Sequence, residues 1–427
     1  MITSSLNQLS IYDQTNKKKI AFGYNAFIDI GASHPGGTIK MVLKSGKKEF
    51  TSISDVICRD GVYDIQDFLN SITKKIEKLI NDSQEKIASL KKDDKKLDKA
   101  VIFVPAHIVN NKASILVNIR DANNKSLENV NFGLIEGLLK KSGIQISEKF
   151  KLSTINDIIG TASGVLPTLL RNYRDLFCKF TQVIVCNTGG GCGIAYIRKV
   201  GGGFLIKAKE TNFNPPAGLT NFIDAKTNNM FAELKEGACV PALISNYGKA
   251  LDMEQNQINS LVQAANAGIV TRYMPDLKQE EMQTLINEGL FDKKTMTLTD
   301  LKEHDHLRAS KDAIFKYIDS IAKFYAAKSI NDKNALVLSG PLVKGIKTSI
   351  QENPENFDGK TLAELIEQRT REYLNKNNQG KKMAHKIKVI DNIEISDNTL
   401  GAELLMKGYT IDAMNQSNCM ILPDIKL

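Results

Sequence analysis

Several residue types that would favour particular protein classes are scarce in this sequence. It has no tryptophan, only 10 prolines and only 6 cysteines among 427 residues. The cysteines are widely and irregularly spaced and match neither a disulfide framework nor a Cys-x-x-Cys zinc pair, so we expect reduced thiols. No segment approaches the roughly 18 consecutive apolar residues of a membrane-spanning helix. Residues 1–20 also lack the apolar core of a secretory signal. These absences predict a cytoplasmic protein without membrane contact.

The basic charge of the chain is spread rather than clustered. The net charge is +9, and many lysines stand beside acidic residues, as in the segment KKDDKKLDK. A nucleic-acid-binding face would need clustered basic residues with interleaved aromatic ones. We therefore expect no nucleic-acid partner and interpret most lysines as solvated faces of helices. A basic excess also suits an anionic ligand such as a nucleotide.

The order of the predicted elements indicates an α/β protein that is too long for one core. Residues 18–55 predict three strands joined by short turns, followed by an amphipathic helix over 62–98 and a buried strand over 99–106. Residues 181–208 predict a second set of three strands with glycine turns, which repeats the first set. Helices and strands alternate over the rest of the chain.

Two turns with small residues are candidate phosphate-binding loops. The first, Asp29-Ile30-Gly31-Ala32-Ser33, ends a predicted strand, and the second, residues 187–193, reads NTGGGCG between two strands. Small residues let backbone N–H groups approach phosphate oxygens, and an aspartate can hold Mg²⁺ through water. A plain hairpin is the alternative for the first turn. The second is not a P-loop, because no Gly-Lys-Ser/Thr follows it and no helix begins there.

Two further motifs lie where predicted strands end. Asp157 precedes an apolar helix, and a carboxylate within hydrogen-bond reach can take a proton from an alcohol, while Asn156 could orient the substrate. The alternative is that the pair only caps the helix. Ser339 and Gly340 follow the strand 334–338, in a pattern that is common in α/β proteins.

The order of these motifs resembles the hexokinase–glucokinase branch of the sugar kinase–Hsp70–actin superfamily. Asp29–Ser33 is similar to the first phosphate motif, Asp-x-Gly-Gly-Thr. Asn156–Thr161 is similar to the hexokinase sequence Asn-Asp-Thr-Val-Gly-Thr, whose aspartate is the catalytic base. Residues 187–193 resemble the second phosphate motif, 338–340 the adenosine motif, and 400–403 the Gly-Ala-Ala that opens the last helix. The resemblance extends over nearly the whole chain.

The resemblance implies a two-lobed actin-like ATPase fold of the ribonuclease H-like type. Each lobe would contain a mixed five-stranded sheet flanked by helices, with the nucleotide in the cleft between the lobes. The implied boundaries are 1–157 for the small N-terminal lobe and 158–399 for the large C-terminal lobe. A closing helix over 400–418 would pack back on the first lobe.

The resemblance also implies a kinase that transfers the γ-phosphate of Mg-ATP to a hydroxyl of a hexose or related sugar. Asp157 would be the catalytic base, and Asp29 would hold Mg²⁺ through water. The residues implied to bind ATP are small or hydroxyl-bearing: Gly31, Ala32, Ser33, Thr188, Gly189, Gly190, Gly191, Gly193, Ser339 and Gly340. The residues implied to bind the sugar are polar: Asn156, Glu210, Asn129 and Asn131. A homodimer is an option for the oligomeric state.

The sequence departs from the family pattern in ways that leave alternatives open. The first turn is longer, so either 31–33 or 36–38 would face the phosphates. Asn187 replaces a glycine of the second motif, and Glu210 stands in for the missing Glu-x-Gly-His sugar motif. The cysteine-rich zinc motif of the ROK branch is absent, so we expect no zinc. The alternatives are a kinase for another small molecule, an actin- or Hsp70-like ATPase, and a catalytically dead homologue that binds a ligand or partner.

Overall fold

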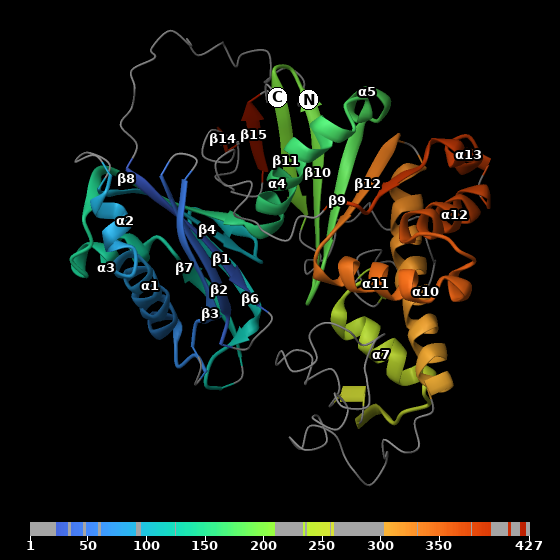
Figure 1. Ribbon diagram of the computed structural model, residues 1–427, viewed down its shortest axis with the longest axis horizontal. Helices are drawn as coiled ribbons and strands as arrows, with labels where there is room; N and C mark the ends of the chain where they lie inside the picture. Colours follow the sequence, from blue (N-terminus) through green and yellow to red (C-terminus); the bar gives the residue numbers. More distant parts are fainter. Residues whose placement is uncertain are drawn as a thin grey trace.

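Two mixed sheets, one from each half of the chain, define the two lobes seen in Figure 1. The computed structural model describes residues 23–32, 36–45, 48–58, 61–90, 95–123, 125–209, 234, 237–256, 258–259, 303–330, 332–376, 378–393, 409–410 and 419–423. Of the helices in these ranges, none is long and apolar enough to cross a bilayer.

The first sheet has the strand order β3-β2-β1-β4-β8. Its strands are β1 (Tyr24–Gly31), β2 (Thr38–Ser45), β3 (Lys48–Val56), β4 (Leu97–Val104) and β8 (Ile146–Asn156). β1, β2 and β3 form an antiparallel meander, whereas β4 and β8 run parallel to β1. The central strands β1 and β4 are buried along most of their length, which explains their nearly continuous apolar sequences.

Helices and a small third sheet complete the first lobe. The helices are α1 (Ile65–Asn81), α2 (Gln84–Ala88) and α3 (Leu134–Lys141). Asp64 caps α1 by accepting a hydrogen bond from the backbone N–H of Asp67 (2.8 Å), and the helix buries apolar side chains at helical spacing. The expected helix over 62–98 is thus shorter, because the chain turns at Asp82 and enters β4 at Leu97.

The third sheet is formed by β5 (Ile108–Val109), β6 (Lys112–Arg120) and β7 (Ser126–Asn131). Its tight turn contains Asn110 and Asn111, both with positive φ (50° and 60°). The amide of Asn111 joins this sheet to β8, because its oxygen accepts a hydrogen bond from the N–H of Thr154 (2.7 Å). The small sheet is thereby fixed to the strand that leads to Asp157.

The second sheet has the order β13-β12-β9-β10-β11-β15-β14. Its strands are β9 (Gln182–Thr188), β10 (Cys192–Val200), β11 (Gly203–Lys209), β12 (Asn334–Ser339), β13 (Lys388–Ile390), β14 (Tyr409–Thr410) and β15 (Cys419–Pro423). β9, β10 and β11 form an antiparallel meander, with β12 parallel to β9 and β13 parallel to β12. Five of the strands therefore repeat the arrangement of the first sheet, as the internal repeat in the sequence predicts.

The second sheet also differs from the expectation of five strands. β15 pairs with the outer edge of β11, and β14 pairs with β15. Tyr409–Thr410 therefore lie in a strand, where we expected the closing helix over 400–418, and this part of the prediction is wrong. The physical reason is that β15 offers these residues an open strand edge. The remaining residues of the expected helix lie outside the described ranges.

Helices cover both faces of the second sheet. They are α4 (Asp157–Asn172), α5 (Leu176–Lys179), α7 (Val240–Ala250), α10 (Glu303–Ser329), α11 (Pro341–Glu352), η5 (Pro354–Phe357), α12 (Leu362–Asn375), α13 (Asn378–Lys381) and η6 (Ala384–Lys386). α10, α11 and α12 share one core with the outer face of the sheet. α4 lies between the two sheets in Figure 1, in a core that includes side chains from both, such as Phe103 and Val185.

Candidate functional site

Two predicted carboxylates meet at one edge of the first sheet. Asp29 of β1 lies opposite Phe103 of β4, which in turn lies opposite Ile155 of β8. These three strands are parallel, so their carboxyl ends share an edge, and strands two apart are separated by about 10 Å. Asp157 follows Ile155 by two residues at the same edge. The fold thus brings Asp29 and Asp157 together although they are far apart in the sequence.

Asn156 caps α4 and is fully buried. Its amide oxygen accepts a hydrogen bond from the backbone N–H of Ile158 (3.1 Å), and its amide nitrogen donates one to the carbonyl oxygen of Ala106 (2.9 Å). Both ends of the amide therefore contact backbone groups of the protein. The expected role of Asn156 as a direct sugar ligand does not fit this position, and the capping alternative describes it better.

Asp157 is the first residue of α4 and is only half-buried. Its carboxylate accepts a hydrogen bond from the N–H of Ile158 (2.8 Å). The N-terminus of a helix favours a negative charge, because its unpaired N–H groups carry partial positive charge. The structure therefore places an accessible carboxylate in a setting that stabilises its charged form.

The glycine-rich turn between β9 and β10 begins at a buried residue and has an exposed tip. Thr188 is buried, and its hydroxyl shares a hydrogen bond with the hydroxyl of Tyr317 (3.1 Å). Gly189 donates to the carbonyl oxygen of Gly191 (2.9 Å). Gly190 and Gly191 are exposed, and a methyl group on either would meet no atom within 4 Å. The Thr188 hydroxyl therefore faces the core and not a ligand. Within this turn, Gly190 and Gly191 are the two residues whose backbone is exposed.

Ser339 and Gly340 lie directly beside this turn. Ser339 pairs with Asn187 in the parallel register of β12 and β9. Gly340 has a φ of 105°, and a methyl group on it would lie 2.3 Å from the carbonyl oxygen of Thr188. Only glycine fits there, because a side chain would be strained by the positive φ and would also overlap the turn. The close approach brings the start of α11 against the glycine-rich turn.

Gly193 connects the turn to the helix that carries Asp157. A methyl group on Gly193 would lie 3.3 Å from the Cβ atom of Ile158. Ordinary carbon–carbon contact is about 3.5–4.0 Å, so the missing side chain allows the first turn of α4 to pack closely on β10. Gly193 is thus explained by helix packing rather than by contact with a phosphate. The same contact places Asp157 beside the glycine-rich turn.

The first turn has two candidate registers, and packing distinguishes them. The carbonyl oxygens of Gly36 and Gly37 accept hydrogen bonds from the two residues that follow β3 (3.1 and 2.8 Å). Gly37 has a φ of 72°, and a methyl group on it would lie 3.0–3.2 Å from three core side chains. These two glycines therefore belong to the core of the lobe. Gly31 and Ala32 remain as candidates at the end of β1, and Ser33 lies outside the described residues.

The predicted sugar-binding residues are only partly described. Asn129 is exposed on β7 with a φ of 54°. Asn131, at the end of the same strand, is half-buried, and its amide oxygen accepts a hydrogen bond from the N–H of Gly133 (3.1 Å). Both belong to the small sheet that Asn111 fixes to β8. Glu210 lies outside the described residues.

The donor atoms at this edge fit a magnesium ion that is shared with a substrate. Mg²⁺ is usually held by one or two carboxylates together with phosphate oxygens and water. Asp29 supplies one carboxylate at this edge, and within the described residues no group of three His, Cys, Asp or Glu forms a protein-only metal cage. The five cysteines whose side chains are described are free thiols. Two of them, Cys186 and Cys192, flank the glycine-rich turn with their sulfur atoms 3.5 Å apart.

Two contacts of the site could not be recognised in the sequence. Tyr317 holds Thr188 from 129 residues away, and Ala106 holds Asn156 from 50 residues away. No local pattern marks Tyr317, which is one of many apolar positions on a long helix. Ala106 was expected only as the last residue of the strand over 99–106, and nothing in that segment indicates a contact with Asn156.

Comparison with known proteins gives structural but no sequence relatives. No protein-family model matches the chain, and no curated protein sequence matches it. The structure of glucokinase from Balamuthia mandrillaris in complex with glucose is similar, with a TM-score of 0.50 and 13% identity, over 94% of this chain and 97% of that one. The ROK hexokinase from Thermus thermophilus has a TM-score of 0.44 and 11% identity, over 89% and 96% of the two chains. The glucokinase from Leishmania braziliensis has a TM-score of 0.44 and 15% identity, over 89% of this chain and 92% of that one. The first similarity shows that the chain has the two-lobed, actin-like fold of a glucokinase.

Proposed function

We propose that the chain is an ATP-dependent sugar kinase, which transfers the γ-phosphate of Mg-ATP to a hydroxyl of a hexose or related sugar. The observation that carries the proposal is the packing of Ile158 on Gly193. This contact joins the first turn of α4, which begins with Asp157, to the strand that follows a glycine-rich turn with exposed residues Gly190 and Gly191, and it supports a site shared by the two. The fold shared with a glucokinase that binds glucose supports the choice of a sugar as acceptor.

In this proposal Asp157 accepts the proton of the attacking hydroxyl. The hydroxyl oxygen forms a bond to the γ-phosphorus as the bond to the bridging oxygen breaks, and ADP leaves. Most of the catalysis in phosphoryl transfer comes from positioning and charge stabilisation. Removal of a positioned base typically costs about 10²–10⁴-fold in rate. Asp157 is the first residue of α4, and a helix N-terminus favours a negative charge at that position.

The nucleotide would lie between the two turns. Gly190 and Gly191 would offer backbone N–H groups to the phosphates, together with Gly31 and Ala32 from the first turn. Asp29 would hold Mg²⁺ through water, and the ion when bound neutralises the negative charge of the phosphates. Thr188, Gly189, Gly193, Ser339 and Gly340 would shape this site through packing.

The sugar-binding residues of the proposal follow the positions found above. We assign Asn156 to positioning, because its amide joins the start of α4 to the loop of Ala106. Asn129, Asn131 and Glu210 remain proposed sugar ligands. A cytoplasmic location and a homodimer likewise remain predictions.

The test is ADP release from Mg-ATP with a panel of hexoses and amino sugars. We expect one or more sugars to stimulate ADP release, and Asp157→Asn to reduce that stimulation by about 10²-fold or more. Asp175→Asn is the matched control, because Asp175 is exposed and pairs only with Lys179 in its own helix (3.1 Å). If no sugar stimulates ADP release while ATP still binds, the kinase proposal is wrong and a partner-binding ATPase or a dead homologue takes its place.

A further inference from the structure

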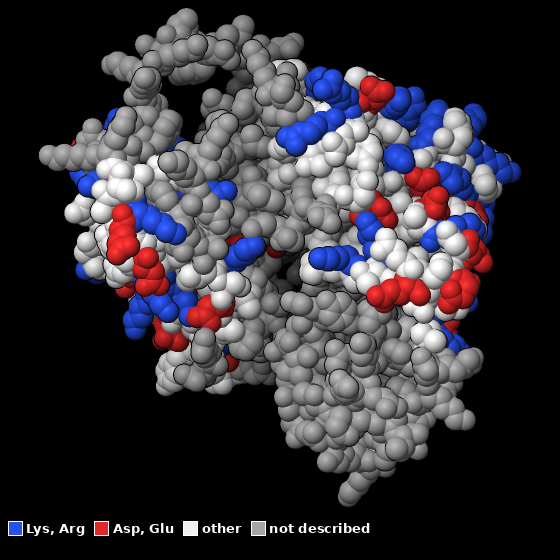
Figure 2. All heavy atoms as spheres, viewed as in Figure 1, with Lys and Arg blue, Asp and Glu red and all other residues white. Residues whose placement is uncertain are grey.

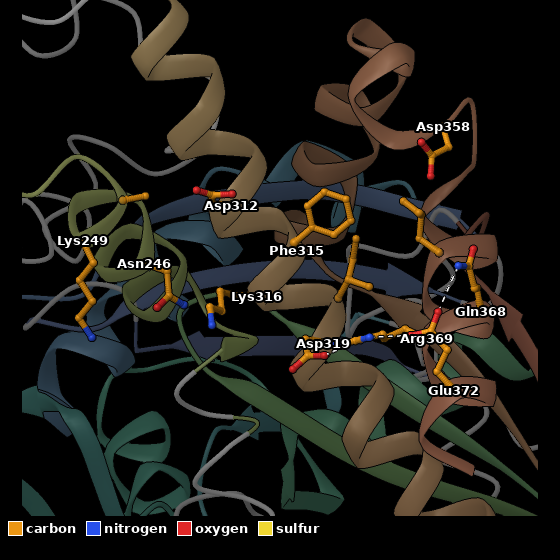
Figure 3. Close-up of a pocket in the computed structure, with 13 residues that line it drawn as sticks. Asn246, Lys249, Asp312, Phe315, Lys316, Asp319, Asp358, Gln368, Arg369 and Glu372 are labelled. Atoms are coloured by element: carbon orange, nitrogen blue, oxygen red, sulfur yellow. Dashed lines mark hydrogen bonds and ion pairs between the residues drawn. The ribbon is translucent and has the colours of Figure 1, made fainter. Parts of the chain in front are cut away.

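A cavity of about 610 Å³ lies in the second lobe, between α7, α10 and α12. None of the residues proposed to bind ATP or sugar lines it. Figure 3 shows its wall, which includes Asn246 and Lys249 of α7, Phe315 and Lys316 of α10, and Arg369 of α12. The cavity is therefore separate from the proposed active site and has no role in the function described above.

The charged groups on the α12 side of the cavity neutralise one another. Arg369 donates hydrogen bonds to Asp319 (2.8 Å) and to Glu372 (2.6 Å). Asp319 also accepts a hydrogen bond from Tyr373 and pairs with Lys323 (3.2 Å). Asp358 on the same side pairs with Lys360 (3.6 Å), so each described charge on this wall has a partner of opposite sign.

The α7 side of the cavity has charges without partners. Lys249 and Lys316 are both exposed, and within the described part of the chain neither has an ion-pair partner. In Figure 3 the amide of Asn246 lies between them, and Asp312 lies on the same helix as Lys316. Two ammonium groups with one amide attract an anion, while the single carboxylate of Asp312 can accept a hydrogen bond.

An apolar surface adjoins these cations. Phe315 is 39% exposed and lines the cavity, so it offers apolar surface that a ligand could cover. It packs on Phe357 on one side, with the ring centroids 5.5 Å apart, and lines the cavity together with Ile318. Covering this ring would remove apolar surface from water and favour a ligand with a flat or apolar body.

We propose that this cavity is a second binding site, for a small organic anion that carries a ring. The anionic group, a phosphate or a carboxylate, lies between Lys249 and Lys316, and the ring packs on Phe315. A hydroxyl or amino group of the ligand donates a hydrogen bond to Asp312. Small-molecule sites combine apolar surface with a few polar groups that fix the orientation of the ligand, and Phe315, the two lysines and Asp312 would serve these two purposes here.

α7 connects this cavity with the glycine-rich turn of the proposed active site. The helix begins with the N–H of Val240, which donates a hydrogen bond to the carbonyl oxygen of Gly189 (2.8 Å). Its 11 residues span about 16 Å, and its other end lines the cavity with Asn246 and Lys249. A ligand that orders this end of α7 also stabilises the hydrogen bond to Gly189.

Binding is measured by ¹⁹F NMR line broadening with two probes, 4-fluorophenyl phosphate and 4-fluorobenzoate. We expect the wild-type chain to bind at least one probe, and the comparison identifies the preferred anionic group. The double variant Lys249→Ala and Lys316→Ala should weaken binding by about 10-fold or more, because charge-assisted hydrogen bonds are lost. Lys381→Ala with Lys382→Ala is the matched control, since both lysines are exposed and lie outside the cavity.

Two outcomes would overturn the proposal. They are failure of both probes to bind at millimolar concentration and equal binding by the Lys249/Lys316 double variant, which would place the probe at another site. Phe315→Leu should weaken ring-bearing probes but not inorganic phosphate, which lacks a ring.

The link to the glycine-rich turn is measured by hydrogen exchange of the Val240 amide. We expect exchange to slow several-fold when the probe is bound and to be unchanged by the probe in the Lys249/Lys316 double variant. Unchanged exchange in the wild type would refute the link. Neither readout uses catalysis, so a failure of the kinase proposal would leave both measurements interpretable.

Discussion

Replacing Gly193 by alanine tests the contact that places Asp157 beside the glycine-rich turn. The added methyl group would lie 3.3 Å from the Cβ atom of Ile158 and 3.4 Å from two further atoms of that side chain. Ordinary contact is about 3.5–4.0 Å, so Ile158 must move by a few tenths of an ångström. Asp157 precedes Ile158 directly and moves with it.

Two opposing terms set the effect of this substitution on stability. Overpacking a filled site typically costs about 1–3 kcal/mol. Replacing glycine by alanine at an ordinary φ also restricts the unfolded chain, which stabilises by about 0.4–1 kcal/mol. Gly191→Ala is the matched control. It restricts the unfolded chain in the same way, but its methyl group would meet no atom within 4 Å and so causes no overpacking. We therefore expect Gly193→Ala to be less stable than Gly191→Ala by about 1–3 kcal/mol in urea denaturation.

The turnover number should reveal the displacement of Asp157. A misplacement of 1 Å can cost about 10²-fold in rate, so a shift of a few tenths of an ångström should lower kcat by roughly three- to ten-fold. Ile158→Ala alone should cost about 2–5 kcal/mol, because Ile158 is buried. Combined with Gly193→Ala it should cost less than the sum of the two single effects, because two of the three crowded atoms are removed. A Gly193→Ala variant with the stability of Gly191→Ala and the kcat of wild type would refute the assigned contact.

Three further substitutions test other contacts of the site. Gly340→Ala should prevent folding or lower Tm sharply, because its methyl group would lie 2.3 Å from a backbone oxygen and its φ of 105° disfavours a side chain. Circular dichroism on heating measures the change in Tm. Asn156→Ala should cost about 1–2 kcal/mol as a lost cap and should lower kcat with little change in the sugar KM, whereas a direct sugar ligand would raise KM. Thr188→Val should cost about 1–3 kcal/mol by leaving the buried hydroxyl of Tyr317 unpaired, and Tyr317→Phe in addition should restore much of it. An unchanged KM for ATP in the Thr188 variant would agree with a hydroxyl that faces the core.

The parts of the fold that rest on local patterns were predictable from the sequence. Both three-stranded meanders follow from apolar strands joined by glycine turns, and their similarity identified the repeat. β14 and β15 were not predicted, since β14 is two residues long and its pairing depends on an edge supplied by distant strands. The pattern over 400–418 favours a helix locally, but at Tyr409–Thr410 pairing with β15 prevails.

The candidate site was predictable as a set of motifs but not in the roles of its members. Asp29 lies near the end of one strand and Asp157 directly follows another, and parallel strands bring such residues to one edge, so it could be inferred that both lie there. The roles of Asn156, Thr188 and Gly193 could not, because each depends on a contact with a segment far away in the chain. A motif fixes which residue types are present, whereas the packing of distant elements decides which of them can face a ligand.

The position of α4 bears on how the two lobes could move. Its apolar side chains share one core with Phe103 of the first sheet and Val185 of the second. Close-packed cores have a few discrete arrangements and do not deform continuously. A change in the angle between the lobes must therefore leave the contact between Ile158 and Gly193 intact or break it as a unit. That contact joins the start of α4 to β10, and Asp29 lies in the same sheet as β8, the strand that leads into α4. In the proposed function, Asp29, Asp157 and the glycine-rich turn would therefore keep their relative positions for as long as this contact is intact.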